Sequence, residues 1–322
     1  MTLLKRVPVW AWRSLMTGLS TFESNRFNRD PLTTVDYETD IDFVGDGIPA
    51  HRLDVITPTG DPAERGPLPV YVYFHGGGWT SGDKAALTKY CASQAEGGMV
   101  VVNVNYRLAT RFSLLTGFSM RHVLDDADAA LAWVSGNISR YGGDPSQIVL
   151  GGDSAGGHIT ALYAAAVVDP ALAEHHGLEP RLDRESLRGV VQHCSIVDFS
   201  VIFERGFILG LGFIQMLLPG KLTGLAMRAA AHFLSPIEWV GADYPPVFVT
   251  TSERDYFYRA NLNFVQRLRL HGVPVDTVIY PRASSNTAHT WQQNARFPES
   301  QEVYRRLRTF VEGVTARPIP AM

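Results

Sequence analysis

The chain has 322 residues, of which 45% are hydrophobic and 19% are charged, so it can bury a sizeable core and is not a compositionally disordered chain. The 29 basic and 32 acidic residues give a formal net charge of −3, which argues against nucleic acid as a partner. The two cysteines, Cys91 and Cys194, cannot by themselves form a disulfide framework or a thiolate metal cluster.

Near the N-terminus, apolar side chains recur at the spacing of an amphipathic helix that begins at Pro8; they are Trp12, Leu15, Met16 and Leu19. We expect this face to pack on the protein itself, with docking on a membrane as the alternative. Arg13 interrupts the apolar run before it reaches the length of a signal peptide, and no apolar stretch reaches the roughly 20 residues of a spanning helix. The sequence therefore predicts a cytoplasmic protein without stable membrane insertion.

From residue 35 onward, extended segments alternate with helical patterns. The segment 67–74 is almost continuously apolar, as a strand covered on both faces should be. The predicted strands are residues 39–44, 51–56, 67–74, 99–104, 147–150, 189–194, 246–250 and 275–280, and the clearest helices are 123–134, 155–168 and 259–270. This alternation predicts an α/β fold with a mainly parallel central sheet flanked by helices.

The block 199–234 interrupts this alternation and is rich in Phe, Leu, Ile, Met and Gly. An apolar insertion above the carboxyl ends of a parallel sheet forms a cap over a site. An extra pair of packed helices is the alternative, and the two are compatible. We expect one domain over residues 1–322, with residues 1–45 and the insertion 199–235 forming a helical cap.

Ser154 is the candidate nucleophile. It stands in a G-x-S-x-G pattern with Gly152 and Gly156, after a predicted strand and before a predicted helix. Glycines are needed there because a sharp strand-to-helix turn crowds its neighbours and lifts the serine oxygen out of the backbone. The helix N-terminus favours a developing anion, so this context predicts acyl-transfer chemistry at the serine.

The segment His75-Gly76-Gly77-Gly78-Trp79 directly follows the buried strand 67–74. Three consecutive glycines let backbone N–H groups approach a ligand oxygen without side-chain obstruction. Opposite the serine, they would complete an oxyanion hole with the N–H of Ala155. A phosphate loop is excluded, because no Gly-Lys-Ser/Thr follows the glycines.

A serine nucleophile also needs a base, and the chain order for this fold is serine, acid, histidine. Seven histidines follow Ser154, and five lie in the nucleophile helix, a charged surface stretch, a predicted strand or the apolar block: His158, His175, His176, His193 and His232. His271 reads as the end of a helix, because Gly272 follows it. His289 lies in the loop after the last strand. The loops at the carboxyl ends of the strands carry the functional residues of α/β folds, so His289 is the predicted base.

The predicted acid is Asp255, in the loop that leaves the strand 246–250. Glu253, two residues earlier, and Asp198, after the preceding strand, are the alternatives. Either could orient the imidazole if the loops brought it to the histidine.

Four motifs, taken together and in this order, resemble the α/β-hydrolase carboxylesterases of the hormone-sensitive lipase group: His75-Gly76-Gly77-Gly78-Trp79, Asn105-Tyr106-Arg107-Leu108-Ala109, Tyr141-Gly142-Gly143-Asp144-Pro145 and Gly152-Asp153-Ser154-Ala155-Gly156-Gly157. The resemblance covers roughly residue 70 to the C-terminus. It implies a triad of Ser154, Asp255 and His289, with the N–H groups of Gly76, Gly77 and Ala155 as the oxyanion hole. The segment 80–84 is closer to bacterial feruloyl-esterase-like and formamidase-like hydrolases.

These residues predict a serine carboxylesterase that hydrolyses uncharged short-to-medium acyl esters through an acyl-enzyme, with no metal and no organic cofactor. The apolar block and Trp79 suggest a mostly apolar substrate pocket. The expected partner is a small ester, and a homodimer is left open. The alternatives are a formamidase or amidase of the same fold, an interfacial lipase and a non-catalytic small-molecule-binding protein.

Overall fold

In this computed structural model, the residues described are 9, 11, 14, 27–61, 66–109, 117–204, 207, 210–218, 220 and 222–315. The predicted N-terminal helix positions Trp12, Leu15, Met16 and Leu19 lie outside these residues. In the described part of the chain, no helix is both long enough and apolar enough to cross a membrane.

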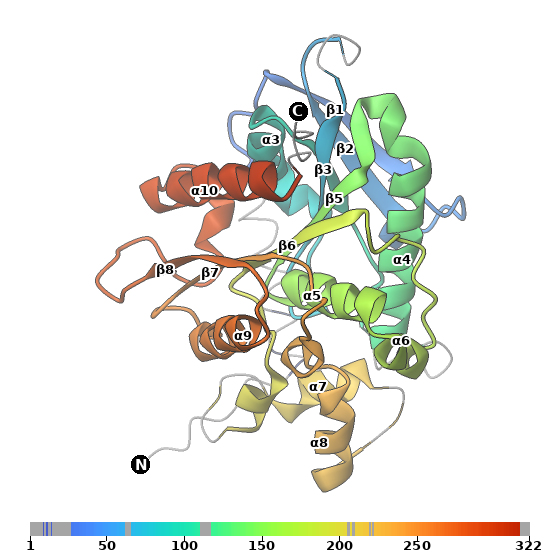
Figure 1. Cartoon of the computed structure of the whole chain (residues 1–322), viewed down its shortest axis with the longest axis vertical. Helices are drawn as coiled ribbons and strands as arrows, with labels where there is room; N and C mark the ends of the chain where they lie inside the picture. Colours follow the sequence, from blue (N-terminus) through green and yellow to red (C-terminus); the bar gives the residue numbers. More distant parts are fainter. Residues whose placement is uncertain are drawn as a thin grey trace, which may run out of the picture.

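One eight-stranded sheet runs through the molecule in the order β1-β2-β4-β3-β5-β6-β7-β8 (Figure 1). Its strands are β1 (Val35–Asp42), β2 (Arg52–Pro58), β3 (Leu68–Phe74), β4 (Val100–Val104), β5 (Gly143–Asp153), β6 (Leu187–His193), β7 (Val247–Ser252) and β8 (Val275–Tyr280). The pairs β1–β2 and β2–β4 are antiparallel, and every other neighbouring pair is parallel. The predicted mainly parallel α/β sheet is therefore confirmed, with the first strand four residues earlier than expected.

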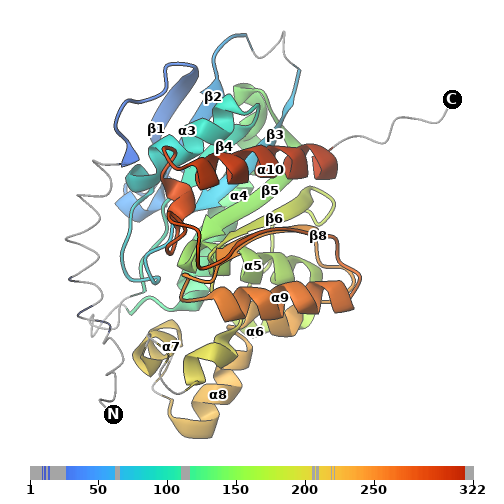
Figure 2. The same ribbon diagram turned by 90° about the vertical axis from the view of Figure 1, so that its left-hand side faces the viewer.

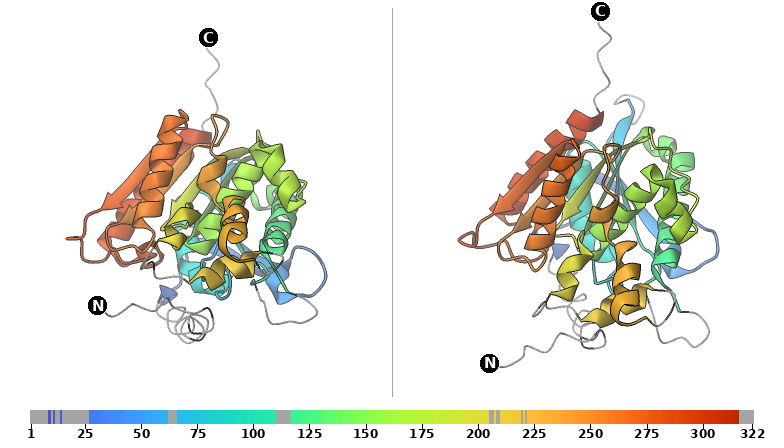
Figure 3. Two further views of the ribbon diagram at one scale, coloured as in Figure 1. Left: turned by 90° about the horizontal axis from the view of Figure 1, so that it is seen from below. Right: turned by 60° about the horizontal axis from the view of Figure 1, so that its bottom comes forward.

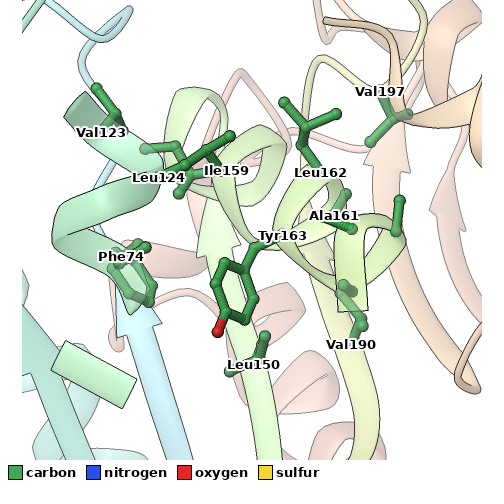
Figure 4. Packing of buried hydrophobic residues seen from close by; sticks show 14 of the residues in the cluster. Phe74, Val123, Leu124, Leu150, Ile159, Ala161, Leu162, Tyr163, Val190 and Val197 are labelled. Carbon is green, nitrogen blue, oxygen red and sulfur yellow. The ribbon is translucent and has the colours of Figure 1, made fainter. Parts of the chain in front are cut away.

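Helices cover both faces of this sheet because alternate side chains of the buried strands point to opposite sides. In β3, Val70, Val72 and Phe74 join one core cluster, and Tyr71 and Tyr73 join the other. The first cluster contains side chains of α4 (Met120–Asn137), α5 (Ala155–Val168) and α9 (Tyr258–Leu270), and the second contains side chains of α3 (Thr88–Glu96) and α10 (Pro298–Thr315). Figure 4 shows Ile159 of α5 beside Leu124 of α4, Tyr163 of α5 close to Leu150 of β5, and Leu162 on the other side of α5, toward Val197.

The insertion after β6 forms a short 3-10 helix (Phe199–Phe203) and the two helices α7 (Leu211–Leu217) and α8 (Gly224–His232). Figure 2 shows α7 and α8 together at one end of the molecule, beyond α5 and α9 and far from α10. Figure 3, seen from that end, shows the insertion (yellow to gold) in front of the central helices. The helices α3, α6 (Pro170–His176) and α10 were not among the predicted elements, although Val303, Leu307, Phe310 and Val311 of α10 are buried at helical spacing.

Candidate active site

Ser154 lies between the last residue of β5 and the first residue of α5, with a φ of +51°. A non-glycine residue in this left-handed region is strained, and the surrounding structure must hold it there. Its N–H donates a 2.9 Å hydrogen bond to the carbonyl of His193 on the neighbouring strand. A Cβ at Gly156 would overlap the carbonyl oxygen of Phe74, so only glycine lets α5 begin this close to β3.

Ser154, His289 and Asp255 form a chain of hydrogen bonds. The Nε2 atom of His289 lies 3.1 Å from the hydroxyl of Ser154, and its Nδ1 atom lies 2.7 Å from Oδ1 of Asp255. Because a carboxylate only accepts, Nδ1 carries the proton and Nε2 is left as the acceptor for the serine hydroxyl. This is the tautomer that a general base at the serine requires.

Asp255 is itself oriented by its loop. Thr251 donates its hydroxyl to Oδ2 over 2.9 Å, and the backbone N–H of Phe257 donates to Oδ1 over 3.2 Å. The alternatives do not contact the imidazole: Glu253 accepts the backbone N–H of Arg282, and Asp198 accepts that of Ser200. Of the three candidate acids, the fold brings Asp255 to His289.

The predicted role of Gly76 in the oxyanion hole is wrong in this structure, because its N–H donates a 3.0 Å hydrogen bond to Oδ1 of Asp153. The next two glycines are different. Gly77 and Gly78 have φ values of +119° and +62°, and for their N–H groups and that of Ala155 the described chain provides no hydrogen-bond acceptor. Successive N–H groups in such a turn form a concave site for an anion. Sequence reasoning missed Gly78, although the third glycine of the motif was its signal.

Asp153 is completely enclosed beneath this loop. Its carboxylate accepts hydrogen bonds from the hydroxyl of Tyr73 and the N–H of Gly76, both over 3.0 Å. Burial raises the pKa of Asp153 to about 6, and the bond from Tyr73, the charge of His289 and the bond from Gly76 limit that rise. The residue before Ser154 therefore links the loop 75–79 to β5, the strand that leads into the serine.

Trp79 was predicted to line the substrate pocket, and the structure places its indole in the core at 1% exposure. The ring nitrogen donates a 3.0 Å hydrogen bond to Nδ1 of His158, in the second turn of α5. The ring also packs against Phe199, the first residue of the insertion, with 5.8 Å between centroids. Trp79 thus contacts the insertion through Phe199.

A buried polar chain supports the loop that carries His289. Gln292 donates its side-chain amide to the hydroxyl of Thr250 over 2.6 Å, and its backbone carbonyl accepts the hydroxyl of Tyr304 over 2.5 Å. The same Thr250 hydroxyl lies 2.7 Å from Nδ1 of His193, whose pKa burial lowers to about 3. These contacts connect β6, β7, α10 and the loop that carries His289. Nothing in the local sequence indicated them.

Cys194, Asp255 and His289 are a group of possible metal ligands in the described residues, with one donor atom each within 4.8 Å of the others. Asp255 and His289 already bind each other. Burial raises the pKa of the Cys194 thiol well above its usual value, so the sulfur stays protonated and is a poor ligand. The arrangement suits a carboxylate that orients an imidazole better than it suits a metal centre.

Comparison with known proteins relates this site to hydrolases. A family model described as alpha/beta hydrolase fold matches residues 71–289. Carboxylesterase NlhH of Mycobacterium tuberculosis is 43% identical over 221 residues, which cover 67% of this chain and 65% of that protein. Probable carboxylic ester hydrolase LipM of the same organism is 32% identical over 191 residues, covering 59% of this chain and 42% of that protein. The matched segment thus spans less than two thirds of either relative.

Solved esterase structures share the architecture. Esterase B from Lactobacillus rhamnosis superposes with a TM-score of 0.77 at 23% identity, over 92% of each chain. A hyperthermophilic esterase from Pyrobaculum calidifontis gives a TM-score of 0.67 at 23% identity, over 95% of this chain and 94% of that one. At these identities the likeness establishes the fold. Together with the family match over residues 71–289, it shows that this chain belongs to the α/β hydrolase fold family.

Proposed function

We propose that the protein is a serine carboxylesterase that hydrolyses uncharged short-to-medium acyl esters. The observation that carries this proposal is the hydrogen-bonded chain from Ser154 through His289 to Asp255, together with the N–H groups of Gly77 and Gly78, which meet no acceptor in the described part of the chain. Support also comes from relatives that carry the names carboxylesterase and carboxylic ester hydrolase.

In the first half-reaction, Nε2 of His289 takes the proton of the Ser154 hydroxyl while the serine oxygen attacks the ester carbonyl carbon. The carbonyl π electrons move onto the oxygen and form a tetrahedral intermediate. When the oxyanion re-forms the carbonyl, the C–O bond to the alcohol breaks, and His289 returns its proton to the departing alkoxide. The serine is then left as an acyl ester.

In the second half-reaction, water replaces the alcohol. His289 takes a proton from the water, whose oxygen attacks the acyl carbon, and the intermediate collapses to release the carboxylic acid and the free Ser154 hydroxyl. Asp255 stays ionised throughout and stabilises the imidazolium that forms in each half-reaction. Every proton that His289 accepts is returned, so the chemistry needs no further reactant.

The N–H groups of Gly77, Gly78 and Ala155 are the proposed donors to the oxyanion. They are fixed before the substrate arrives, so stabilising the negative charge requires no reorganisation during the reaction. The N–H of Ala155 also lies at the N-terminus of α5, where the helix carries partial positive charge.

The cap is proposed to consist of the insertion 199–235 and the residues before β1. Residues 35–42 of the predicted cap segment 1–45 form the first strand of the sheet instead. The support for this cap is that the insertion packs Phe213, Ile214 and Leu217 of α7 into the core, and that Val9 packs near Gly212 at the start of α7. Such apolar walls favour an uncharged acyl chain. The role of Trp79 in this pocket is proposed to be indirect, through the contact with Phe199. The cytoplasmic location and the homodimer stay predictions.

The experiment that tests this function is hydrolysis of p-nitrophenyl esters from acetate to palmitate, with Ser154→Ala beside the unchanged protein. We expect turnover to peak at short chains and to fall by roughly 10⁴-fold or more in the variant. A fluorophosphonate probe should add one adduct by mass spectrometry, on Ser154.

Ser195→Ala is the matched control, because Ser195 is buried after the neighbouring strand and its hydroxyl has no partner among the described residues. It should keep both turnover and the adduct. Formamides are assayed in parallel. Faster turnover of formamides than of esters would replace this proposal with a formamidase, and activation at an oil–water interface would replace it with a lipase.

A further inference from the structure

The buried pair Trp79 and His158 has no part in the mechanism above. His158 is wholly enclosed, and both of its ring nitrogens are engaged: Nδ1 lies 3.0 Å from the indole nitrogen of Trp79, and Nε2 lies 2.7 Å from the backbone carbonyl of Leu234. One imidazole therefore connects the loop after β3, the nucleophile helix and the end of the insertion.

The two partners determine the tautomer of His158. The indole N–H can only donate, so Nδ1 accepts, and the carbonyl of Leu234 can only accept, so Nε2 carries the hydrogen. Burial lowers the pKa of His158 to about 3, so the ring is neutral at physiological pH and offers one donor and one acceptor. Both bonds are satisfied only by this neutral form.

Trp79 is the last residue of the loop 75–79, which carries the proposed donors Gly77 and Gly78 and is called the oxyanion loop below. Its φ of +62° continues the positive values of Gly77 and Gly78, and for a bulky side chain this conformation is strained. Strain of this kind persists only where the surroundings hold it. Trp79 is held by the bond from its indole to His158, by the 2.7 Å bond from the N–H of Ala109 to its carbonyl, and by the packing of its ring against Phe199.

The other end of the connection is the base of the insertion, where its first and last residues meet. The ring of Phe199 lies 4.9 Å from the imidazole of His158, centroid to centroid. The N–H of Phe199 donates to the hydroxyl of Ser235 over 3.0 Å, and Leu234 precedes that serine. Both ends of the insertion thus rest on the same histidine.

We propose that His158 is a positioning residue that holds the oxyanion loop through Trp79 and the base of the cap through Leu234. The role in turnover rests on the proposed esterase function, whereas the clamp itself is a property of the fold. Its two arms are separable, because each ring nitrogen serves one partner. The Nδ1 arm governs oxyanion stabilisation, and the Nε2 arm governs which acyl chains the cap accepts.

Two substitutions remove one arm each. In His158→Asn the amide oxygen stands near the position of Nδ1 and can still accept from Trp79, but the side chain is too short to reach Leu234. In His158→Gln the amide nitrogen stands near the position of Nε2 and can still donate to Leu234, but Trp79 loses its acceptor. Trp79→Phe removes the same bond from the other side.

For turnover, we expect His158→Gln to lower kcat by roughly 10- to 100-fold at every chain length with little change in KM, since a displaced oxyanion donor costs up to roughly 10²- to 10³-fold. His158→Asn should recover most of this kcat and change KM for the longer esters. Trp79→Phe combined with His158→Gln should lose no more kcat than His158→Gln alone.

A second readout does not depend on turnover. The indole N–H resonances of the six tryptophans are compared by ¹H–¹⁵N NMR, and Trp79→Phe identifies the one that belongs to Trp79. This resonance should keep its shift and its slow hydrogen exchange in His158→Asn and lose both in His158→Gln. If the unchanged protein hydrolysed no ester, the proposed function would fail, and this measurement would still support or overturn the clamp.

His176→Asn is the matched control, because Nε2 of His176 bonds to the carbonyl of Phe233, one residue before Leu234, and no described contact joins it to Trp79. It should leave both kcat and the Trp79 resonance unchanged. Equal loss of kcat in His158→Asn and His158→Gln, or an unmoved indole resonance in His158→Gln, would overturn the proposal and leave His158 a core residue only.

Discussion

Asp153 has two opposed effects at the residue scale. Its carboxylate accepts the N–H of Gly76 and so anchors the oxyanion loop, but burial raises its pKa from 3.8 to about 6. Because the folded-state pKa is the higher one, the folded protein binds this proton more tightly than the unfolded chain between those values. Ionisation therefore costs stability as the pH rises from about 4 to 6, by up to about 3 kcal/mol, and the cost is constant above that range.

Asp153→Asn should remove this cost and keep the anchor, because the amide oxygen can accept from both Tyr73 and Gly76. The difference in unfolding free energy between the variant and the unchanged protein should rise, in favour of the variant, by up to about 3 kcal/mol from pH 4 to pH 8. Urea unfolding across this range measures it. A difference in unfolding free energy between Asp153→Asn and the unchanged protein that did not vary with pH would contradict the expectation. Asp153→Ala, which leaves the N–H of Gly76 without this acceptor, should lose more kcat than Asp153→Asn.

At the scale of elements, the packing of α5 on β3 decides where the nucleophile stands. The first turn of α5 lies so close to the end of β3 that a Cβ on Gly156 would overlap the carbonyl oxygen of Phe74 and lie 2.6 Å from that of His75. Backbone atoms cannot move aside as a flexible side chain can. The helix start, the serine and the oxyanion loop are therefore positioned by one contact between two elements.

Gly156→Ala should push α5 away from β3, cost roughly 1–3 kcal/mol in unfolding free energy and lower kcat by at least tenfold. Gly136→Ala in α4 is the matched control, because nothing lies within 4 Å of a Cβ there. Alanine at that helical position should be neutral or add up to about 1 kcal/mol. Thermal unfolding and ester turnover are measured for both variants. Equal stability and equal kcat of the two variants would contradict the role assigned to the contact between α5 and β3.

At the scale of the whole molecule, buried neutral histidines determine how much folding stability is lost as the pH falls. Burial lowers the pKa of His158 and His193 to about 3 and that of His176 to about 4. The charged residues around His176 predicted a surface position for it, but in α6 its ring lies against the backbone carbonyl of Phe233. In each case the unfolded chain takes up a proton near pH 6.5 that the folded protein does not.

The stability that these neutral rings contribute should therefore be fully present well above pH 6.5. It should fall as the pH drops through 6.5, toward about 3 for His158 and His193 and toward about 4 for His176. Three such protons remove roughly 6 kcal/mol between pH 7 and pH 5, and Asp153, which gains stability there, offsets about 1 kcal/mol. Urea midpoints at pH 5, 6 and 7 measure the slope, and His158→Gln should reduce it by about a third. An unfolding free energy that stayed level below pH 6.5 would contradict this account.

Features that depend on neighbours in the chain could be predicted from the sequence. Extended segments between helical patterns predicted the eight strands. A buried parallel strand is recognisable from its own residues, because it is apolar on both faces. The glycines around Ser154 predicted the strained turn for the same local reason. The order of serine, acid and histidine then predicted three residues that the structure brings into hydrogen-bond contact.

What the tertiary structure alone decided is which polar groups are already engaged. The N–H of Gly76 is engaged by Asp153, 77 positions along the chain, whereas the N–H groups of Gly77 and Gly78 meet no acceptor among the described residues. The bond of His158 to Trp79 likewise depends on the distance between two segments that are far apart in the sequence. A polar group inside a protein has only a few partners within reach, and the packing of the elements determines which of them it meets.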